Sequence, residues 1–157
     1  MFMTKTTRFA IVAILLWVVT IAVFAWFFIR GNTIAGADGR AAVVLHADER
    51  AFVLAEMRSM LAATQGILEG VNKGDLKKVM TSASAAGMSG TAEVNPALMT
   101  KLPLSFKTLG LSLHHDMDDI AEAAAKGKPV TEIQNMLATT LTKCIACHSA
   151  WQLETEK

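Results

Sequence analysis

The sequence has no tyrosine, only three prolines and only two cysteines among its 157 residues. Proline, the strongest helix breaker, is therefore scarce in a chain in which 52% of the residues are hydrophobic and alanine, leucine and methionine are abundant. Such a composition favours helices. The length suits one domain with a proper core and is too short for two ordinary domains. We therefore expect an all-α fold.

Several patterns are missing as well. There is no basic stripe with interleaved aromatic residues, so nucleic-acid binding is not expected. We find no internal repeat and no strand-like alternation of useful length. Neither a nucleophile paired with a base nor two carboxylates beside an evident cleft indicates an enzyme. Both cysteines lie within four residues of each other, which excludes a disulfide framework and indicates one local site.

The N-terminal part contains one long apolar run. From Phe9 to Ile29, 21 residues include no charge, glycine or proline. At about 1.5 Å per residue, a helix of this length spans roughly 30 Å, the thickness of the hydrocarbon core of a bilayer. Trp26, Phe27 and Phe28 cluster at its C-terminal end, where aromatic side chains favour the membrane interface. We predict a single transmembrane helix.

A cleaved secretory signal is the alternative interpretation of this run, because Ala35-Gly36-Ala37 offers a small-residue cleavage site. The apolar core of a signal peptide is usually about 7–15 residues long, which is shorter than the run. Length therefore favours an uncleaved anchor. Basic residues lie on both sides of the run, so charge alone does not orient it in the membrane.

Residues 31–47 contain three glycines and are predicted to form a short flexible tether. The chain then divides into a membrane anchor at 1–30, this tether, and a globular domain at 48–157.

The globular domain contains four segments with apolar residues at helical spacing. Aspartates are predicted to cap the first two helices and prolines to open the other two. The expected helices run from Asp48 to Asn72–Gly74, from Asp75 to a break near Gly87 and Gly90, from Pro103 to Lys126–Pro129, and from Pro129 to about Leu153, with a helical turn from Asn95-Pro96 through Met99. Four amphipathic helices with short connections indicate an antiparallel four-helix bundle.

The cysteines belong to the segment Cys144-Ile145-Ala146-Cys147-His148, which matches the Cys-x-x-Cys-His signature for covalent attachment of c-type haem. Two thiols three residues apart lie on the same side of a helical turn, so both can add to the vinyl groups of one haem. His148, the next residue, can then reach the iron as the proximal ligand. We predict one haem c attached at Cys144 and Cys147 and ligated by His148.

Two other interpretations of the cysteine pair fit less well. A zinc site would need two further ligands, and the remaining candidates, His46, His114 and His115, do not have a finger-like spacing. A thioredoxin-like redox pair would need a strand-and-helix setting that the pattern does not predict.

With this motif close to the C-terminus of a four-helix domain, residues 48–153 resemble the class II cytochromes c, the family of cytochrome c′ and its low-spin relatives. The resemblance depends on the segment Lys143–Trp151, which is specific, and on the four-helix pattern, which is generic. In the family a basic residue often follows the motif after an aromatic one. Here Gln152 follows Trp151, so the chain departs from the family at the position of a haem-propionate partner.

The resemblance also bears on the sixth position of the iron. In cytochrome c′ this position is empty and the high-spin iron binds diatomic gases, whereas in low-spin members a methionine of the first helix fills it. Met57, followed by Arg58 about ten residues into the first predicted helix, matches the low-spin pattern and is our first candidate. Met60 faces the bundle too, so helical periodicity does not choose between them, and either thioether could simply fill the core.

The remaining histidines are weaker candidates. His114 is predicted at the boundary of the apolar face of the third helix, where it could flank the haem, bond a propionate or have no iron role. His115 and His46 are predicted to be exposed.

Two functions follow from the motif. The first is one-electron transfer, without enzymatic activity, by a membrane-anchored cytochrome whose partners are periplasmic or membrane redox proteins. The alternative is binding of nitric oxide or carbon monoxide by a five-coordinate haem. Because covalent haem attachment in bacteria takes place outside the cytoplasmic membrane, the expected location is the bacterial inner membrane with the haem domain in the periplasm. A homodimer would also fit the family.

Overall fold

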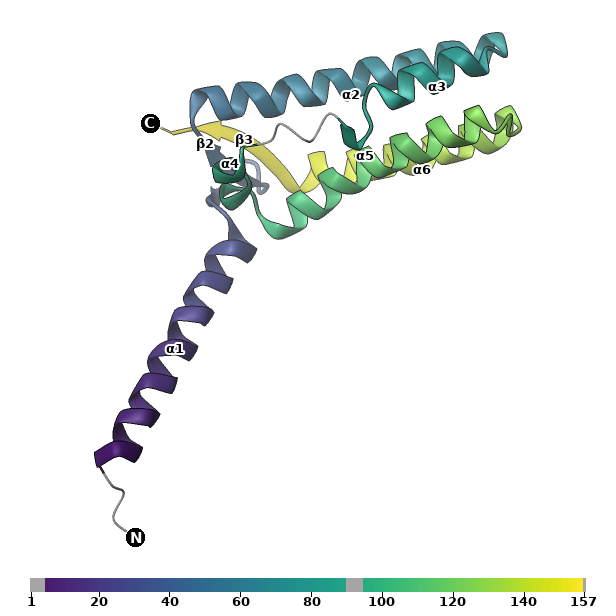
Figure 1. Ribbon diagram of the computed structural model, residues 1–157. Helices are drawn as coiled ribbons and strands as arrows, with labels where there is room; N and C mark the ends of the chain where they lie inside the picture. Colours follow the sequence, from purple (N-terminus) through teal and green to yellow (C-terminus); the bar gives the residue numbers. More distant parts are fainter. Residues whose placement is uncertain (1–4, 90–94, 157) are drawn as a thin grey trace.

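The computed structural model describes residues 5–89 and 95–156. The chain is mostly helical, and a small sheet joins its N-terminal and C-terminal parts (Figure 1). The elements in chain order are α1 (Lys5–Arg30), β1 (Thr33–Ala35), β2 (Ala41–Leu45), α2 (Ala47–Lys73), α3 (Leu76–Ser84), α4 (Pro96–Lys101), α5 (Leu104–Ala125), α6 (Val130–Ala150) and β3 (Trp151–Thr155).

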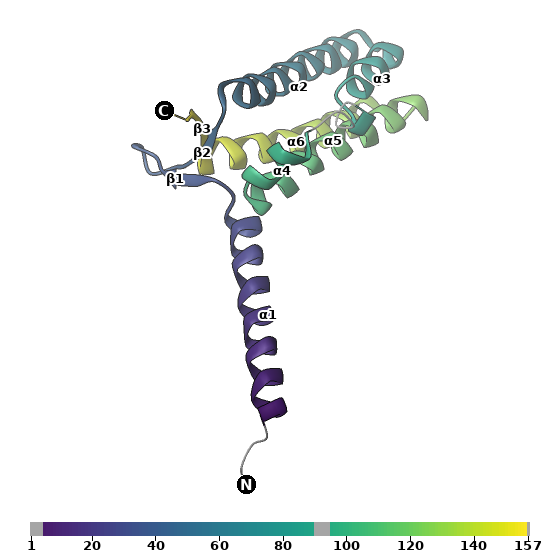
Figure 2. The ribbon, with the colours of Figure 1, turned by 60° about the vertical axis from the view of Figure 1, so that its left-hand side comes forward.

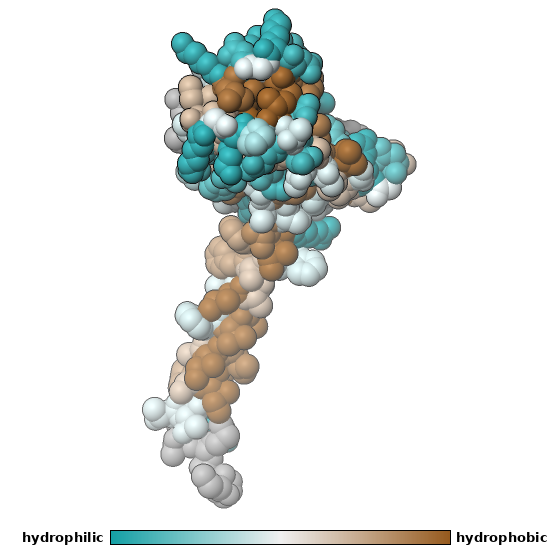
Figure 3. All heavy atoms as spheres, turned by 90° about the vertical axis from the view of Figure 1, so that its right-hand side faces the viewer, coloured by the Kyte–Doolittle hydropathy of each residue, from teal (hydrophilic) through white to brown (hydrophobic). Residues whose placement is uncertain are grey.

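Helix α1 projects from the rest of the molecule as a separate stalk (Figure 2). Its segment Thr6–Arg30 is long and apolar enough to cross a membrane, and none of it is buried against the protein. Figure 3 shows the contrast between this hydrophobic stalk and the head, where hydrophilic side chains surround a hydrophobic patch at the end viewed. A helix that exposes so many large apolar side chains is stable only where something other than water surrounds it.

The prediction of a flexible tether at residues 31–47 is wrong. Strands β1 and β2 form an antiparallel hairpin, and β2 pairs in parallel with β3, with Val43 opposite Leu153. The sequence of β2 is a continuous apolar run, typical of a strand buried on both faces, and so it lacks the alternation that marks a half-exposed strand. Ala42, Val43 and Leu45 are completely buried.

The same pairing shortens the last helix. Helix α6 ends at Ala150 and not near Leu153, because Trp151 takes an extended backbone conformation and begins β3. The chain is mostly helical, as expected, but strands form in the predicted tether and at the C-terminal end of the predicted domain.

The helix boundaries elsewhere follow the capping residues of the sequence. Asp75 accepts a hydrogen bond from the backbone of Lys78 at the start of α3, and Asn95 caps α4 in the same manner. Gly74, with φ +66°, ends α2 as expected. Helix α2, however, is capped by His46 and not by Asp48, because the Glu49 carboxylate reaches back to the His46 backbone N–H. Gly90 lies outside the described residues.

Helices α2 and α3 lie in one layer and α5 and α6 in a second, with contacts of α2 to α6 and of α3 to α5 between them (Figure 1). The buried side chains form two clusters. One fills the part of the head farther from the sheet and includes Ile67, Val79, Met117, Ile120 and Ile133. The other lies beside the sheet and includes Val43, Leu45, Leu102, Phe106 and Cys147. The second cluster therefore contains one of the two cysteines of the motif.

The stalk is held to the head at one compact joint. Lys107 of α5 is only 7% exposed, and its Nζ atom lies 3.4 Å from the backbone oxygen of Phe28 and 3.8 Å from the centre of the Phe28 ring. The Nζ atom also donates a hydrogen bond of 3.1 Å to the Met99 carbonyl. Burial lowers the pKa of Lys107, and the two carbonyls together with the aromatic face compensate for the lost hydration.

The chain then turns at Gly31 with φ +63°, after which the Asn32 N–H donates to the Lys101 carbonyl over 2.7 Å. A Cβ atom on Gly31 would lie 2.5 Å from both the Lys101 oxygen and the Pro103 nitrogen. Only glycine fits this joint.

We expect Gly31→Ala to destabilise the head far more than Gly127→Ala. Gly127 has nearly the same backbone angle, φ +69°, but open space where a Cβ would lie, so both variants carry the backbone strain and only the first carries the steric clash. The clash should cost about 1–3 kcal/mol more. Thermal unfolding of the full chain in detergent, followed by circular dichroism, measures the difference. Equal losses of stability in the two variants would show that the joint is loose.

Candidate functional site

The three residues of the motif lie on the last turns of α6, where the helix passes between the second buried cluster and a cavity. Cys147 is 9% exposed and packs among the side chains of that cluster. Cys144 is half-buried, and neither cysteine forms a disulfide. The imidazole-bearing residue His148 is exposed. All three line the larger of two adjoining cavities in the head. The structure thus brings the predicted attachment residues together on one wall.

That larger cavity has a volume of about 530 Å³, which lies within the range of roughly 300–1,000 Å³ usual for ligand pockets. Helix α2 forms one wall, α5 the floor and α6 the opposite wall. Apolar side chains dominate the lining, among them Val53, Leu61, Leu113 and Leu141. A smaller cavity of about 170 Å³ adjoins it toward the sheet and shares Leu54, Met57, Phe106, Cys147 and His148 with it. The two are neighbouring parts of one cleft between α2 and α6.

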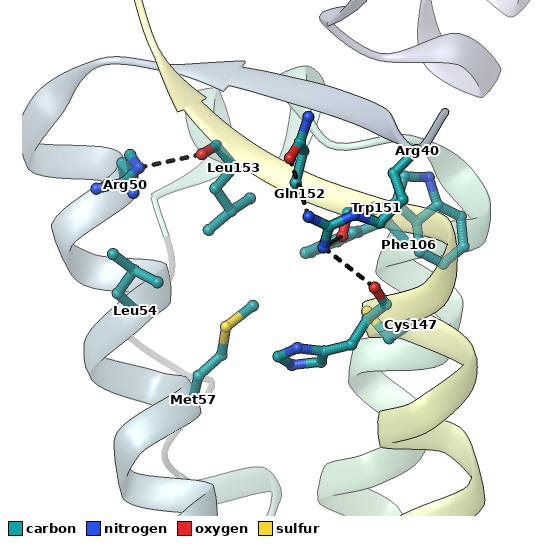
Figure 4. Close-up of a pocket in the computed structure, with 10 residues that line it drawn as sticks. Arg40, Arg50, Leu54, Met57, Phe106, Cys147, Trp151, Gln152 and Leu153 are labelled. Atoms are coloured by element: carbon teal, nitrogen blue, oxygen red, sulfur yellow. Dashed lines mark hydrogen bonds between the residues drawn. The ribbon is translucent and has the colours of Figure 1, made fainter. Parts of the chain in front are cut away.

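The two candidate methionines lie in different parts of this cleft. Met57 lines both cavities and packs against the cluster that contains Cys147. Figure 4 shows its side chain pointing from α2 into the smaller cavity, toward α6. Met60 lines only the larger cavity and packs against the other core cluster. Met57 therefore shares both cavities with His148, whereas Met60 shares one.

The smaller cavity is polar at the end near β3 (Figure 4). Arg50 of α2 donates from Nε to the Leu153 carbonyl over 3.3 Å. Among the residues that the structure describes, the two terminal amino groups of Arg50 have no hydrogen-bond partner. They are available to a carboxylate in the cavity, which a guanidinium can bind through two parallel hydrogen bonds.

Arg40, from the β1–β2 hairpin, reaches the same cavity. Its guanidinium donates to the backbone oxygen of His148 and to the side chain of Gln152. Sequence reasoning missed Arg40 and Arg50 because the strands that bring them to the motif were not predicted. The one available signal was the position of Gln152, which lacks the expected positive charge and which the structure places against Arg40.

The start of the motif is fixed to the neighbouring helix. Lys143, which precedes Cys144, forms an ion pair of 2.7 Å with Asp116 of α5, and Asp116 also accepts a hydrogen bond from Thr140. Thr140 is only 1% exposed, so this polar contact lies against the core. The last two turns of α6 are therefore held on α5 from one side while α2 faces them across the cleft.

The other histidines differ in burial and in their contacts. His114 is half-buried in the wall of the larger cavity, and its Nδ1 lies 2.8 Å from the Ala86 carbonyl. This contact engages one of the two ring nitrogens with the protein backbone. His115 is exposed, as expected. His46 is exposed as well, but it caps α2 and lies 2.6 Å from Glu156, so it is part of the folded head and not of a tether.

Burial raises the pKa of both thiols, and a nearby charge adds to the effect: Asp116 in the case of Cys144, and Cys144 in the case of Cys147. A redox-active Cys-x-x-Cys pair depends on the opposite shift, a lowered pKa that produces thiolate near neutral pH. The local environment thus disfavours a thioredoxin-like role. Over residues 5–89 and 95–156, no group of three or more His, Cys, Asp or Glu side chains could hold a metal ion.

Comparisons with protein-family models, with curated proteins and with solved structures give no match to this chain. The residues and the geometry of the cleft therefore carry the functional argument alone.

We expect the two thiols of the haem-free protein to react slowly with an alkylating reagent, and Cys147 more slowly than Cys144. The raised pKa lowers the thiolate fraction of both, and Cys147 is the more buried of the two. Mass spectrometry after timed alkylation at pH 8 gives both rates. The denatured chain serves as the control, and alkylation of Cys147 at the denatured rate would contradict its burial in the cleft.

Proposed function

We propose that this chain is a membrane-anchored c-type cytochrome that transfers single electrons. The observation that carries the proposal is the placement of Cys144, Cys147 and His148 on one wall of an apolar cavity of about 530 Å³, with Met57 in the wall opposite. A resemblance to the low-spin class II cytochromes c supports it. On this proposal α2, α3, α5 and α6 correspond to the antiparallel four-helix bundle of that family, with α3 as a short second helix.

The residues of the cleft fit a haem. The two thiols would take up its vinyl groups, and His148 would ligate the iron from the α6 side. Apolar side chains of α2 and α5 suit the porphyrin ring, while the free amino groups of Arg50 suit its carboxylates at the polar end of the cleft. A covalently held cofactor needs no full enclosure, which agrees with a cleft between two layers of helices.

When bound, a haem supplies a one-electron couple between ferric and ferrous iron. The protein residues determine how that couple is used. Met57 provides a thioether on the α2 side, and Met/His ligation is typical of electron-transfer cytochromes with raised reduction potentials. Apolar side chains of the wall such as Leu54 and Phe106 would limit the access of water to a bound haem and so the reorganisation of the solvent when its charge changes.

The anchor determines where this chemistry takes place. Because α1 is long and apolar enough to span a membrane once and covalent haem attachment in bacteria takes place outside the cytoplasm, we place the chain in the bacterial inner membrane with its haem domain in the periplasm. Its partners on this proposal are periplasmic or membrane redox proteins. The small-residue segment Ala35-Gly36-Ala37 begins with the last residue of β1 and continues into the turn toward β2. A Cβ on Gly36 would clash with the Gln152 side chain, so packing accounts for this glycine without a cleavage site.

We expect the purified full chain to carry one covalently bound haem and to give low-spin absorption spectra in both oxidation states. The oxidised protein should also show the weak sulfur-to-iron band at long wavelength. Release of free haem in acidified solvent would contradict covalent attachment. A high-spin ferrous spectrum that shifts on adding carbon monoxide would replace electron transfer by gas binding as the proposed function.

The choice of sixth ligand is tested by Met57→Ala and Met60→Ala, made separately. We expect Met57→Ala to abolish the sulfur-to-iron band and to open the iron to carbon monoxide, because Met57 lines both cavities with His148. Met60→Ala is the matched control, because it removes a thioether from the same helix and, since Met60 is only partly buried, should destabilise the core by less than the roughly 2–5 kcal/mol of a fully buried methionine. The reverse pattern would identify Met60 as the ligand, and two unchanged spectra would exclude both.

A further inference from the structure

Arg40 occupies an unusual position for a residue so close to the membrane helix. It follows the turn of the β1–β2 hairpin, yet its guanidinium reaches the C-terminal end of α6, more than a hundred positions later in the chain (Figure 4). Its NH1 group lies 3.2 Å from the backbone oxygen of His148 and 3.4 Å from that of Trp151. Its NH2 group lies 3.0 Å from the side-chain oxygen of Gln152.

The other N–H groups of Arg40 are directed at Asp38. Nε donates to its carboxylate over 2.8 Å, and NH2 lies 2.6 Å from the same oxygen. The guanidinium, which has five N–H donors, thus forms four hydrogen bonds, to two backbone carbonyls, one amide oxygen and a carboxylate, and its NH2 group is also ion-paired with that carboxylate. Both terminal nitrogens of Arg40 are engaged by the protein, whereas those of Arg50 form no hydrogen bond with the described residues. The two arginines of the smaller cavity therefore have different roles.

The acceptor at His148 is one of the last four carbonyls of α6, which have no partner inside the helix. A cation at this end also interacts favourably with the helix dipole. Trp151 supplies an N–H to the Cys147 carbonyl, and Arg40 supplies one to the next carbonyl along. The backbone of the last turn, which sets the direction of the His148 side chain, is therefore held by a residue from another element.

The hairpin is built to hold Arg40 in place. Gly36 packs directly on the Gln152 side chain, because a Cβ atom there would clash with the amide nitrogen of Gln152 and lie 2.6 Å from the Arg40 carbonyl. Gly39, with φ +89°, allows the tight turn just before Arg40. The hydrogen bond from Arg40 lowers the pKa of Asp38, so the pair stays ionised through neutral pH.

We propose that Arg40 is a positioning residue for His148: it fixes the last turn of α6 from the membrane-proximal hairpin and so sets the orientation of the proximal imidazole toward the iron. The inference rests on the proposed haem function. It differs from a carboxylate-binding role, which the free donors of Arg50 would suit.

The test compares Arg40→Gln with Arg50→Gln in the full chain. Both variants remove one positive charge from the same cavity, but only the first removes the bonds to the His148 and Trp151 carbonyls. We expect amide hydrogen exchange of residues 148–151 to rise about tenfold in Arg40→Gln relative to Arg50→Gln, which corresponds to the loss of one or two hydrogen bonds from the Arg40 side chain to backbone carbonyls. Arg40→Lys, which keeps the charge without the planar five-donor geometry, should give an intermediate rise and guards against a misfolded glutamine variant.

The second measurement is the electron paramagnetic resonance spectrum of the oxidised protein, which reports the orientation of the axial ligands. We expect Arg40→Gln to give altered or multiple low-spin signals and Arg50→Gln a single low-spin signal. Identical spectra and identical exchange in the two variants would overturn the positioning role, even if Arg40→Gln lowers the melting temperature. A wild-type chain without haem would instead overturn the proposed function, an outcome read directly from its absorption spectrum.

Discussion

The parallel pairing of β2 with β3 determines the geometry of the candidate site. Because Trp151 must be extended to pair with Ala41, α6 stops three residues after Cys147 and presents the motif on its final turn. The same pairing carries the β1–β2 hairpin, and with it Arg40, to the end of α6. It also covers one end of the cleft with the side chains of Trp151 and Leu153. Without this ladder the helix could continue and the cleft would lose its polar end.

Parallel pairing requires a long connection between the two strands, and here the whole helical part of the head supplies it. The chain leaves β2, passes through α2 to α6 and returns as β3 beside its starting point (Figure 1). The sheet therefore joins the start of the helical part of the head to its end. Two buried clusters stabilise this arrangement, one far from the sheet and one against it, and the cleft lies along α2 and α6 beside them.

Most of the helical structure could be predicted from the sequence because its signals are local. Asp75 and Asn95 cap helices by their own side chains, and Gly74 ends one by its backbone angle. The attachment motif is local too, which is why its three residues were identified together. The strands could not be found in this way. The apolar run of β2 is short enough to pass for a linker, and its stability comes from a partner strand more than a hundred residues away.

The difference between local signals and contacts that are distant in the sequence also explains which residues of the site could not be predicted. Arg40 and Arg50 look like ordinary basic residues until the sheet and the start of α2 place them around the end of α6. Gln152 looked like the loss of a positive charge, whereas in three dimensions a guanidinium from the hairpin lies against it. Helical periodicity placed Met57 and Met60 on one face of α2 but could not show that the cleft continues past Met57 toward the sheet.

The tight joint at Gly31 and Asn32 has a consequence for encounters with other molecules. A head on a flexible tether would sample a hemisphere above the bilayer and present its cleft in every direction. With α1 in a membrane, a head clamped to the end of its own helix would keep its cleft at one height above the lipid. On the proposed electron-transfer function, its search for a partner would be two-dimensional, and a partner would have to present its own redox centre at that height.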